Sequence, residues 1–178
     1  MLGIIKRSFT YLDRDMFLRL YKGLVRPHLE YANIIWHPTF KRQSVMLENV
    51  QRRATKILNE IKDLEYKERL KYLKLPSIKH RQTRGDLIET YKIIHGFDNL
   101  KANDFFKLAW APQNSKTRNH TLKLYKEYAN TTARCNFFSN RVNNTWNSLS
   151  KEAKLAPDIL TFKKYIDQEL QNIMYDHD

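Results

Sequence analysis

Hydrophobic residues recur every three or four positions along most of the chain, a spacing that is typical of amphipathic helices. The clearest example is the stretch 41–60, which contains no Gly or Pro. Its apolar stripe consists of Leu47, Val50, Ala54, Ile57 and Ile61. Further helices are expected at about 13–25, 27–36, 66–73, 77–95, 137–149 and 157–170. The pattern therefore predicts a mainly α fold of about six to eight helices.

Residues that cap or interrupt helices indicate where several of these helices begin and end. Asp13 and Ser77 precede helical stretches, and their side chains suit the N-cap position. Pro27 interrupts the first helix and suits the first turn of the next one. Gly96 is expected to end the helix that follows Ser77.

The second half of the chain has one region without helical spacing. Residues 111–121 are polar and turn-forming, which predicts an exposed loop. Apolar and polar residues then alternate weakly, so we expect at most one short β-hairpin near 121–129. Phe137, Phe138 and Trp146 recur at helical spacing after it, and we expect them to be core residues rather than platforms for stacked bases.

The charge of the chain points to a polyanionic partner. It has 32 Lys and Arg against 19 Asp and Glu, a net charge of +13, and residues 1–100 contain 20 of the basic and 11 of the acidic side chains. Nucleic acid is the leading partner, because phosphate contacts supply most non-specific affinity. An anionic membrane surface and a merely solvated basic face are the alternatives. The apolar runs are far shorter than the ~20 residues of a membrane-spanning helix, so none is expected.

Two groups of basic residues are candidates for phosphate contacts. The first group lies within about one helical turn, and the second lies near the start of the helix after Ser77, where a helix N-terminus itself attracts phosphate. The candidates are Arg52, Arg53 and Lys56 in the first group, and Lys79, Arg81 and Arg84 in the second. For each group taken alone, the alternative is a solvated surface.

Motifs for catalysis, metal binding and cofactor binding are missing from the sequence. The six His do not have the HExxH spacing, and no Walker loop, nucleophile elbow or GxGxxG is present. Cys135 is the only cysteine, which excludes an internal disulfide and a Cys-rich zinc module, and we expect it to be partly buried. We therefore predict no catalytic residue, no metal ligand and no cofactor.

Four stretches resemble a known family. They are LYKGLVRPHLEYANIIWHP at 20–38, LENVQRRATKIL at 47–58, YKERLKYLKLPSIKHRQTRGDLIETYKIIHG at 66–96 and NFFSNRVNNTWNSL at 136–149. In order and spacing they resemble the reverse transcriptases (RNA-directed DNA polymerases) of non-long-terminal-repeat retrotransposons, the jockey-like LINE group. The resemblance covers essentially the whole chain, and the segment looks like the thumb region and the tail that follow the polymerase palm.

The resemblance implies that the chain consists of two regions with different roles. Residues 1–100 would form a helical thumb-like region and residues 101–178 a helical tail. The thumb would hold an RNA or DNA template–primer duplex through its phosphates, and it would contact the palm. The protein would act inside the cell, in the nucleus or the cytoplasm, and would not bind a membrane.

The family's catalytic signature has two adjacent aspartates, and no two aspartates are adjacent here. The fingers, palm and endonuclease also lack a counterpart, so we expect a C-terminal fragment of the transposable element's enzyme. The Mg²⁺ of the parent enzyme would lie in the missing palm. The fragment would bind nucleic acid without activity of its own. The alternatives are a working polymerase and a catalytically inert helical protein-interaction module derived from the element.

Overall fold

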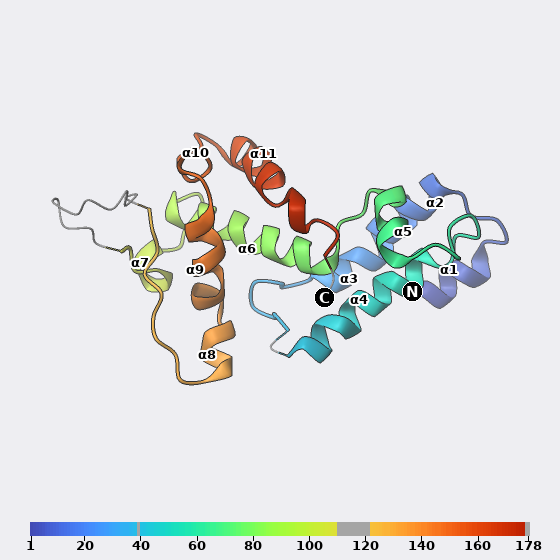
Figure 1. Cartoon of the computed structure of the whole chain (residues 1–178), viewed down its shortest axis with the longest axis horizontal. Helices are drawn as coiled ribbons and strands as arrows, with labels where there is room; N and C mark the ends of the chain where they lie inside the picture. Colours follow the sequence, from blue (N-terminus) through green and yellow to red (C-terminus); the bar gives the residue numbers. More distant parts are fainter. Residues whose placement is uncertain (39, 110–121, 177–178) are drawn as a thin grey trace. The chain divides into compact units, whose positions relative to one another are not determined.

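The computed structural model describes residues 1–38, 40–109 and 122–176, and it is mainly α-helical (Figure 1). Residue contacts divide the chain into two compact units. Unit 1 comprises Met1–Asn33, Phe40–Gln82 and Asn172–Asp178, and unit 2 comprises Ile34–Thr39 and Thr83–Gln171. This division falls inside a helix, after Gln82.

The helices confirm a mainly α fold and outnumber the six to eight expected, because several short ones escape sequence periodicity. The elements of unit 1 are α1 (Leu2–Ser8), α2 (Arg14–Leu20), the π-helix η1 (Tyr21–Val25), α3 (Arg26–Glu30), α4 (Lys41–Thr55), α5 (Tyr66–Leu73) and the first turn of α6 (Ile78–Ile94). The expected caps are confirmed: Asp13 accepts a hydrogen bond of 2.7 Å from the amide of Met16, and Ser77 Oγ accepts one of 3.2 Å from the amide of His80. Gly96 ends α6 with a φ of +70°.

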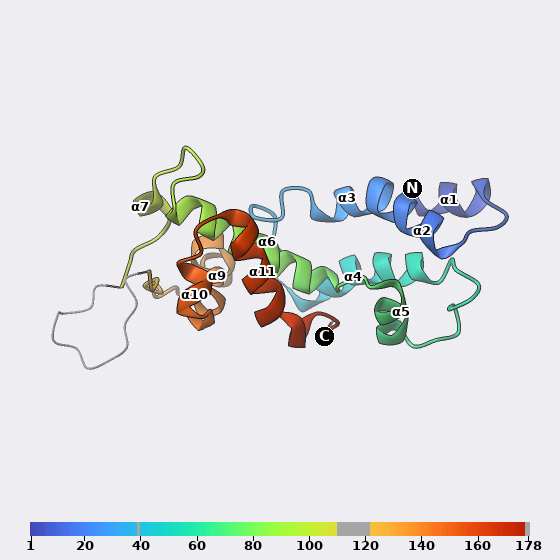
Figure 2. The same ribbon diagram turned by 90° about the horizontal axis from the view of Figure 1, so that it is seen from above.

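A π-helical turn allows one helical path to run through Pro27. In a regular α-helix the ring of Pro27 would clash with the carbonyl of Gly23, four residues earlier. The turn is wider here, since the amide of Arg26 donates to the carbonyl of Tyr21, five residues back. The path from α2 to α3 is therefore continuous, and it runs alongside α4 (Figure 2).

Two expected helices are shorter than their apolar spacing predicted. α3 ends at Glu30 and not near residue 36, because Ala32 takes a left-handed conformation with a φ of +50°. α4 ends at Thr55 and not near residue 60. The turns that follow α4 bury Leu58 and Ile61, so these side chains reach the core from outside the helix.

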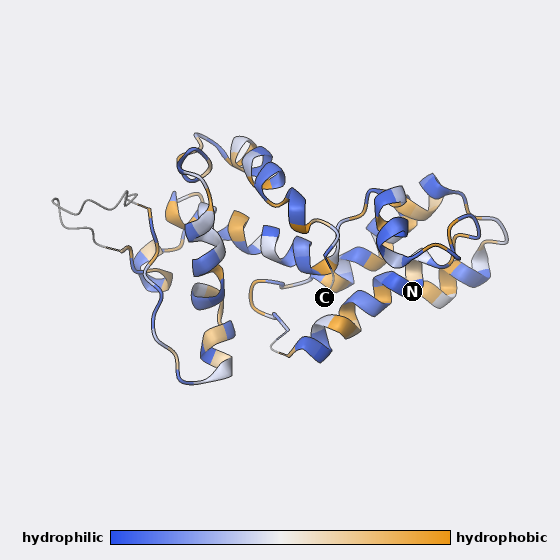
Figure 3. Ribbon diagram, in the orientation of Figure 1, coloured by the Kyte–Doolittle hydropathy of each residue, from blue (hydrophilic) through white to orange (hydrophobic). Residues whose placement is uncertain are grey.

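Each unit has its own apolar core, built from the hydrophobic positions that recur along its helices (Figure 3). The core of unit 1 includes Phe17, Tyr21, Leu70 and Leu73. In unit 2, Trp146 and Phe162 lie in the core with Tyr91, whose ring stacks on Phe162 at 4.3 Å between centroids. The remaining elements of unit 2 are α7 (Ala102–Phe105), α8 (Thr132–Asn136), α9 (Phe138–Ser148), α10 (Lys151–Lys154) and α11 (Ile159–Glu169), and the 3₁₀ helix η2 (Gln171–Ile173) follows α11.

At most one short hairpin was expected near 121–129, and the described residues 122–129 form none. Leu124 forms only an isolated antiparallel bridge, and its partner is Leu108. On its other side, the side chain of Asn147 accepts from the amide of Leu124 at 2.9 Å and donates to its carbonyl at 2.8 Å. The side-chain amide of Asn147 thus makes the two hydrogen bonds that a second neighbouring strand would make with Leu124. The loop expected at 111–121 lies outside the described residues.

Two further expectations about side chains in unit 2 are corrected. Phe137 is half exposed rather than part of the core, because it precedes α9 in an extended conformation, whereas Phe138 and Trp146 are buried as expected. Cys135 is exposed rather than partly buried. None of the described helices is both long and apolar enough to cross a membrane.

Candidate nucleic-acid interface

The first group of predicted basic residues lies together at the C-terminal end of α4 in unit 1. Arg52 and Arg53 occupy the last turn of the helix, Lys56 is its C-cap, and all three are exposed. Cations are favoured at this end of a helix, because the last carbonyl groups leave it partly negative. We call Arg52, Arg53 and Lys56 the α4 basic cluster.

Arg52 is held in place by an aromatic ring. Its guanidinium lies 4.9 Å from the centroid of the Tyr66 ring, at the start of α5, and the guanidinium of Arg69 lies 5.4 Å from the same centroid. Arg69, which is buried, also donates a hydrogen bond of 3.2 Å to the backbone carbonyl of Arg52. Cation–π contact restricts the Arg52 side chain and leaves its hydrogen-bond donors available.

The Tyr66 ring is fixed in turn by its hydroxyl group. This group donates to the carboxylate of Glu48 and accepts a hydrogen bond of 3.1 Å from Gln51 Nε2. Burial, followed by the charge of Glu48, raises the pKa of Tyr66 far above its usual range. The hydroxyl therefore remains protonated and remains a donor at every physiological pH.

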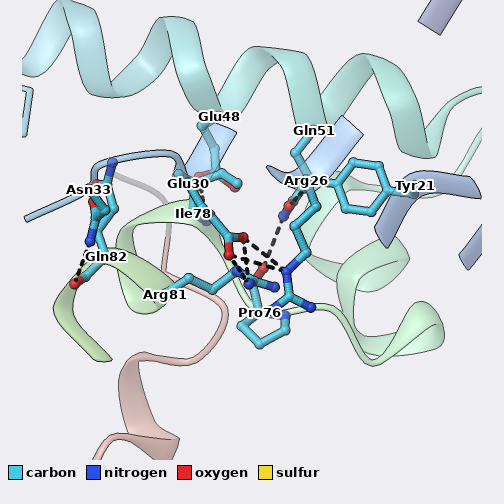
Figure 4. A network of polar contacts seen from close by, with 10 residues as sticks. All are labelled: Tyr21, Arg26, Glu30, Asn33, Glu48, Gln51, Pro76, Ile78, Arg81 and Gln82. Carbon is cyan, nitrogen blue, oxygen red and sulfur yellow. Dashed lines mark hydrogen bonds and ion pairs between the residues drawn. The ribbon is translucent and has the colours of Figure 1, made fainter. Parts of the chain in front are cut away.

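A buried polar network extends from this point to the start of α6 (Figure 4). Gln51 Oε1 accepts a hydrogen bond of 2.5 Å from the Tyr21 hydroxyl, and Gln51 Nε2 donates one of 3.0 Å to the carbonyl of Pro76. Glu48 accepts a hydrogen bond of 2.9 Å from the amide of Ile78. Because buried polar groups are costly when left unpaired, this network fixes η1, α5 and the start of α6 relative to α4 within unit 1.

The first turn of α6 does not offer the open anion site that the sequence suggested. The amide of Ile78 donates to Glu48, and the amide of His80 donates to Ser77 Oγ. A carboxylate of the chain itself thus takes the place of a bound phosphate. Lys79 lies in this turn and is exposed.

The other two predicted residues form ion pairs. Arg81, of which 11% of the side chain is exposed, lies 2.5 Å from the Glu30 carboxylate, which also binds Arg26 at 3.0 Å (Figure 4). Burial lowers the pKa of Arg81, and Glu30 acts in the opposite direction. Arg84 belongs to unit 2, where it makes hydrogen bonds of 2.6 and 3.0 Å to Asp167. A phosphate would have to displace a carboxylate at either arginine.

Sequence reasoning missed the residues that support the α4 basic cluster. Glu48 and Gln51 lie three residues apart on the face of α4 that is buried, although we expected this face to be apolar. Each directly follows a residue of the expected stripe, Leu47 or Val50, and their own spacing of three residues is the signal in the sequence that could have revealed them. Tyr66 carried no such signal, because its partners are distant in the sequence.

In the described part of the chain, no three His, Cys, Asp or Glu side chains are grouped so that they could hold a metal ion. Comparisons with protein-family models, curated proteins and solved structures find no match to the chain.

Proposed function

We propose that this chain binds template–primer nucleic acid through its phosphates, as the thumb and tail of a non-long-terminal-repeat retrotransposon reverse transcriptase, and that it does not catalyse synthesis itself. The four family-like stretches and the net charge of +13 support this proposal. A mainly α fold is compatible with it. Contacts to the phosphate backbone position a duplex without reading its sequence, so little sequence preference is expected.

The observation that carries the proposal is the α4 basic cluster. Three cations at the end of one helix are exposed, and the Arg52 guanidinium lies against the ring of Tyr66. The described ion pairs include Arg81 and Arg84 but neither Arg52 nor Arg53. Arg52 and Arg53, like Lys56, are therefore exposed cations that can exchange a contact with water for a contact with phosphate, whereas Arg81 and Arg84 are held by carboxylates.

The test is a titration of duplex DNA and of an RNA–DNA hybrid at several salt concentrations. Each phosphate contact contributes about 0.9 to the slope of log affinity against log salt on duplex DNA, so replacing Arg52 and Arg53 with Ala should reduce that slope by about 1.8. Binding should weaken equally for unrelated sequences. The matched control is the double variant Lys6→Ala and Arg7→Ala, two adjacent exposed cations of α1 in the same unit.

Equal slopes in the two double variants would show that only net charge matters and would remove Arg52 and Arg53 from the interface. Affinity that does not change with salt in the parent chain would contradict phosphate binding altogether. That result would favour the alternative, a helical module that binds protein.

A further inference from the structure

Unit 2 contains two adjoining hollows that the proposed duplex contacts do not use. They have volumes of about 90 and 360 Å³ and share Tyr125, Glu127 and Asn140 in their walls. The smaller hollow is also lined by Lys107, Arg134 and Phe137, and the larger by Lys126, Tyr128 and Cys135. We call the two hollows together the Tyr125 groove.

Three aromatic rings of the Tyr125 groove are unusually exposed. The exposed fractions are 50% for Phe137, 57% for Tyr125 and 91% for Tyr128. Phe137 faces outward because it is the N-cap of α9 with extended backbone angles, so it leaves the face on which Phe138 and Trp146 are buried. Exposed aromatic rings around one hollow indicate a ligand with flat or apolar surfaces.

The cations of the groove lie beside these rings. Glu127 binds both Lys107, at 2.6 Å, and Arg134, at 2.9 Å. The guanidinium of Arg134 also lies 5.4 Å from the centroid of the Phe137 ring. Lys126 is exposed on the same wall. Four cations, including Arg141, and two carboxylates, those of Glu127 and Asp104, line the groove. Arg141 is paired with Asp86, so the charge of the groove favours an anionic ligand by a small margin.

We propose that the Tyr125 groove binds a short unpaired stretch of nucleic acid. Aromatic rings and Arg guanidinium planes stack with bases of any sequence, whereas phosphates between the bases would reach Lys107, Lys126 and Arg134. A strongly basic chain selects an anionic polymer over a neutral peptide at long range. This binding goes beyond the duplex contacts, and it requires unpaired bases, because the bases of a duplex are already stacked on one another.

The proposal gives Glu127 a definite role. The Glu127 carboxylate pairs with Lys107 and Arg134 when the groove is empty. It therefore competes with phosphates for both cations and lowers the affinity for phosphates. The pKa of Lys107 is raised and that of Glu127 is lowered by this pairing, which is the shift expected of two opposite charges in contact. Replacing Glu127 with Gln should therefore tighten binding and steepen its salt dependence.

The experiment measures the fluorescence anisotropy of a labelled single-stranded oligouridine and, in parallel, of a fully paired RNA–DNA hybrid. Stacking on one ring is typically worth 1–3 kcal/mol, so Tyr125→Ala and Phe137→Ala should each weaken single-strand binding by about 5- to 150-fold. Tyr125→Phe keeps the ring and should bind as the parent does. Tyr31→Ala removes an exposed tyrosine of unit 1 and serves as the matched control.

The variants also separate this proposal from the proposed function. Tyr128→Ala alters a side chain that is almost fully exposed, so it tests the groove without risk to folding. The proposal is wrong if the Ala variants bind oligouridine as tightly as the parent, or if Tyr125→Phe fails as badly as Tyr125→Ala. A proline-rich peptide that binds in a Tyr125-dependent way while oligouridine does not would assign the groove to proteins. In each of these cases, the salt slope measured with Arg52 and Arg53 still decides the duplex contacts.

Discussion

An arginine binds phosphate well when its guanidinium is held outward and no carboxylate competes for it. The ring of Tyr66 restricts the Arg52 guanidinium, and Arg52 takes no part in the described ion pairs. Arg81 is nearly buried against Glu30, so its contribution is to hold α3 to the start of α6 within unit 1. Arg52 and Arg81 thus differ in their availability to phosphate, although both are arginines of unit 1.

His37 provides a prediction at the same scale. It is half-buried in unit 2, its Nδ1 has no hydrogen-bond partner among the described residues, and burial together with the charge of Arg141 lowers its pKa to about 4. Between about pH 6.5 and pH 4 the unfolded chain takes up this proton before the folded chain does, so stability falls as the pH falls. The variant His37→Gln should lose less stability across this window in urea titrations. Parallel curves for parent and variant would show that His37 does not titrate abnormally.

At the scale of the element, local patterns predicted helix positions better than helix ends. The expected helix at 66–73 is confirmed as α5, and the expected 77–95 as α6, because clear caps or breakers bound both stretches. α3 and α4 end early for reasons that spacing cannot show, namely the left-handed Ala32 and the burial of Leu58 and Ile61 from a turn.

The candidate site, too, could be predicted only where it depends on local spacing. The grouping of Arg52, Arg53 and Lys56 could be predicted, since it depends only on helical spacing. The pairing of Arg81 with Glu30, 51 residues away, and of Arg84 with Asp167, 83 residues away, could not, because each depends on tertiary contacts.

The buried network predicts how strongly α4, α5 and α6 depend on one carboxylate. Replacing Glu48 with Ala leaves the Tyr66 hydroxyl and the Ile78 amide without their acceptor in a buried site. Each unpaired buried group costs about 1–3 kcal/mol, so for the two groups unfolding in urea should show a loss of about 2–6 kcal/mol. The control Glu60→Ala removes a carboxylate that accepts an exposed hydrogen bond of 3.3 Å from Tyr72, and it should cost less than about 1 kcal/mol. Equal losses would mean that the network does not stabilise unit 1.

At the scale of the whole molecule, both units are basic. Unit 1 contains 18 Lys and Arg against 10 Asp and Glu, and unit 2 contains 14 against 9. A polyanion is therefore attracted to either unit at low salt, and the local geometry decides what each unit can hold. The α4 basic cluster offers charge without aromatic surface beyond Tyr66, whereas the Tyr125 groove offers aromatic surface with little surplus charge. We expect the salt dependence of duplex binding to be steeper than that of single-strand binding for this reason.

The purified chain should bind a primed RNA template without extending the primer. Nucleotide addition needs divalent metal ions, held by carboxylates, that align the triphosphate with the attacking hydroxyl. The sequence lacks the adjacent aspartates that serve this purpose in the family it resembles. In an assay with oligo(dT) on poly(rA), Mg²⁺ and labelled dTTP, incorporation should equal that of a heat-denatured sample, while anisotropy under the same conditions shows the primer–template bound. Incorporation that survives repurification and scales with the concentration of the chain would contradict a purely binding role, and it would mean that carboxylates distant in the sequence form the metal site.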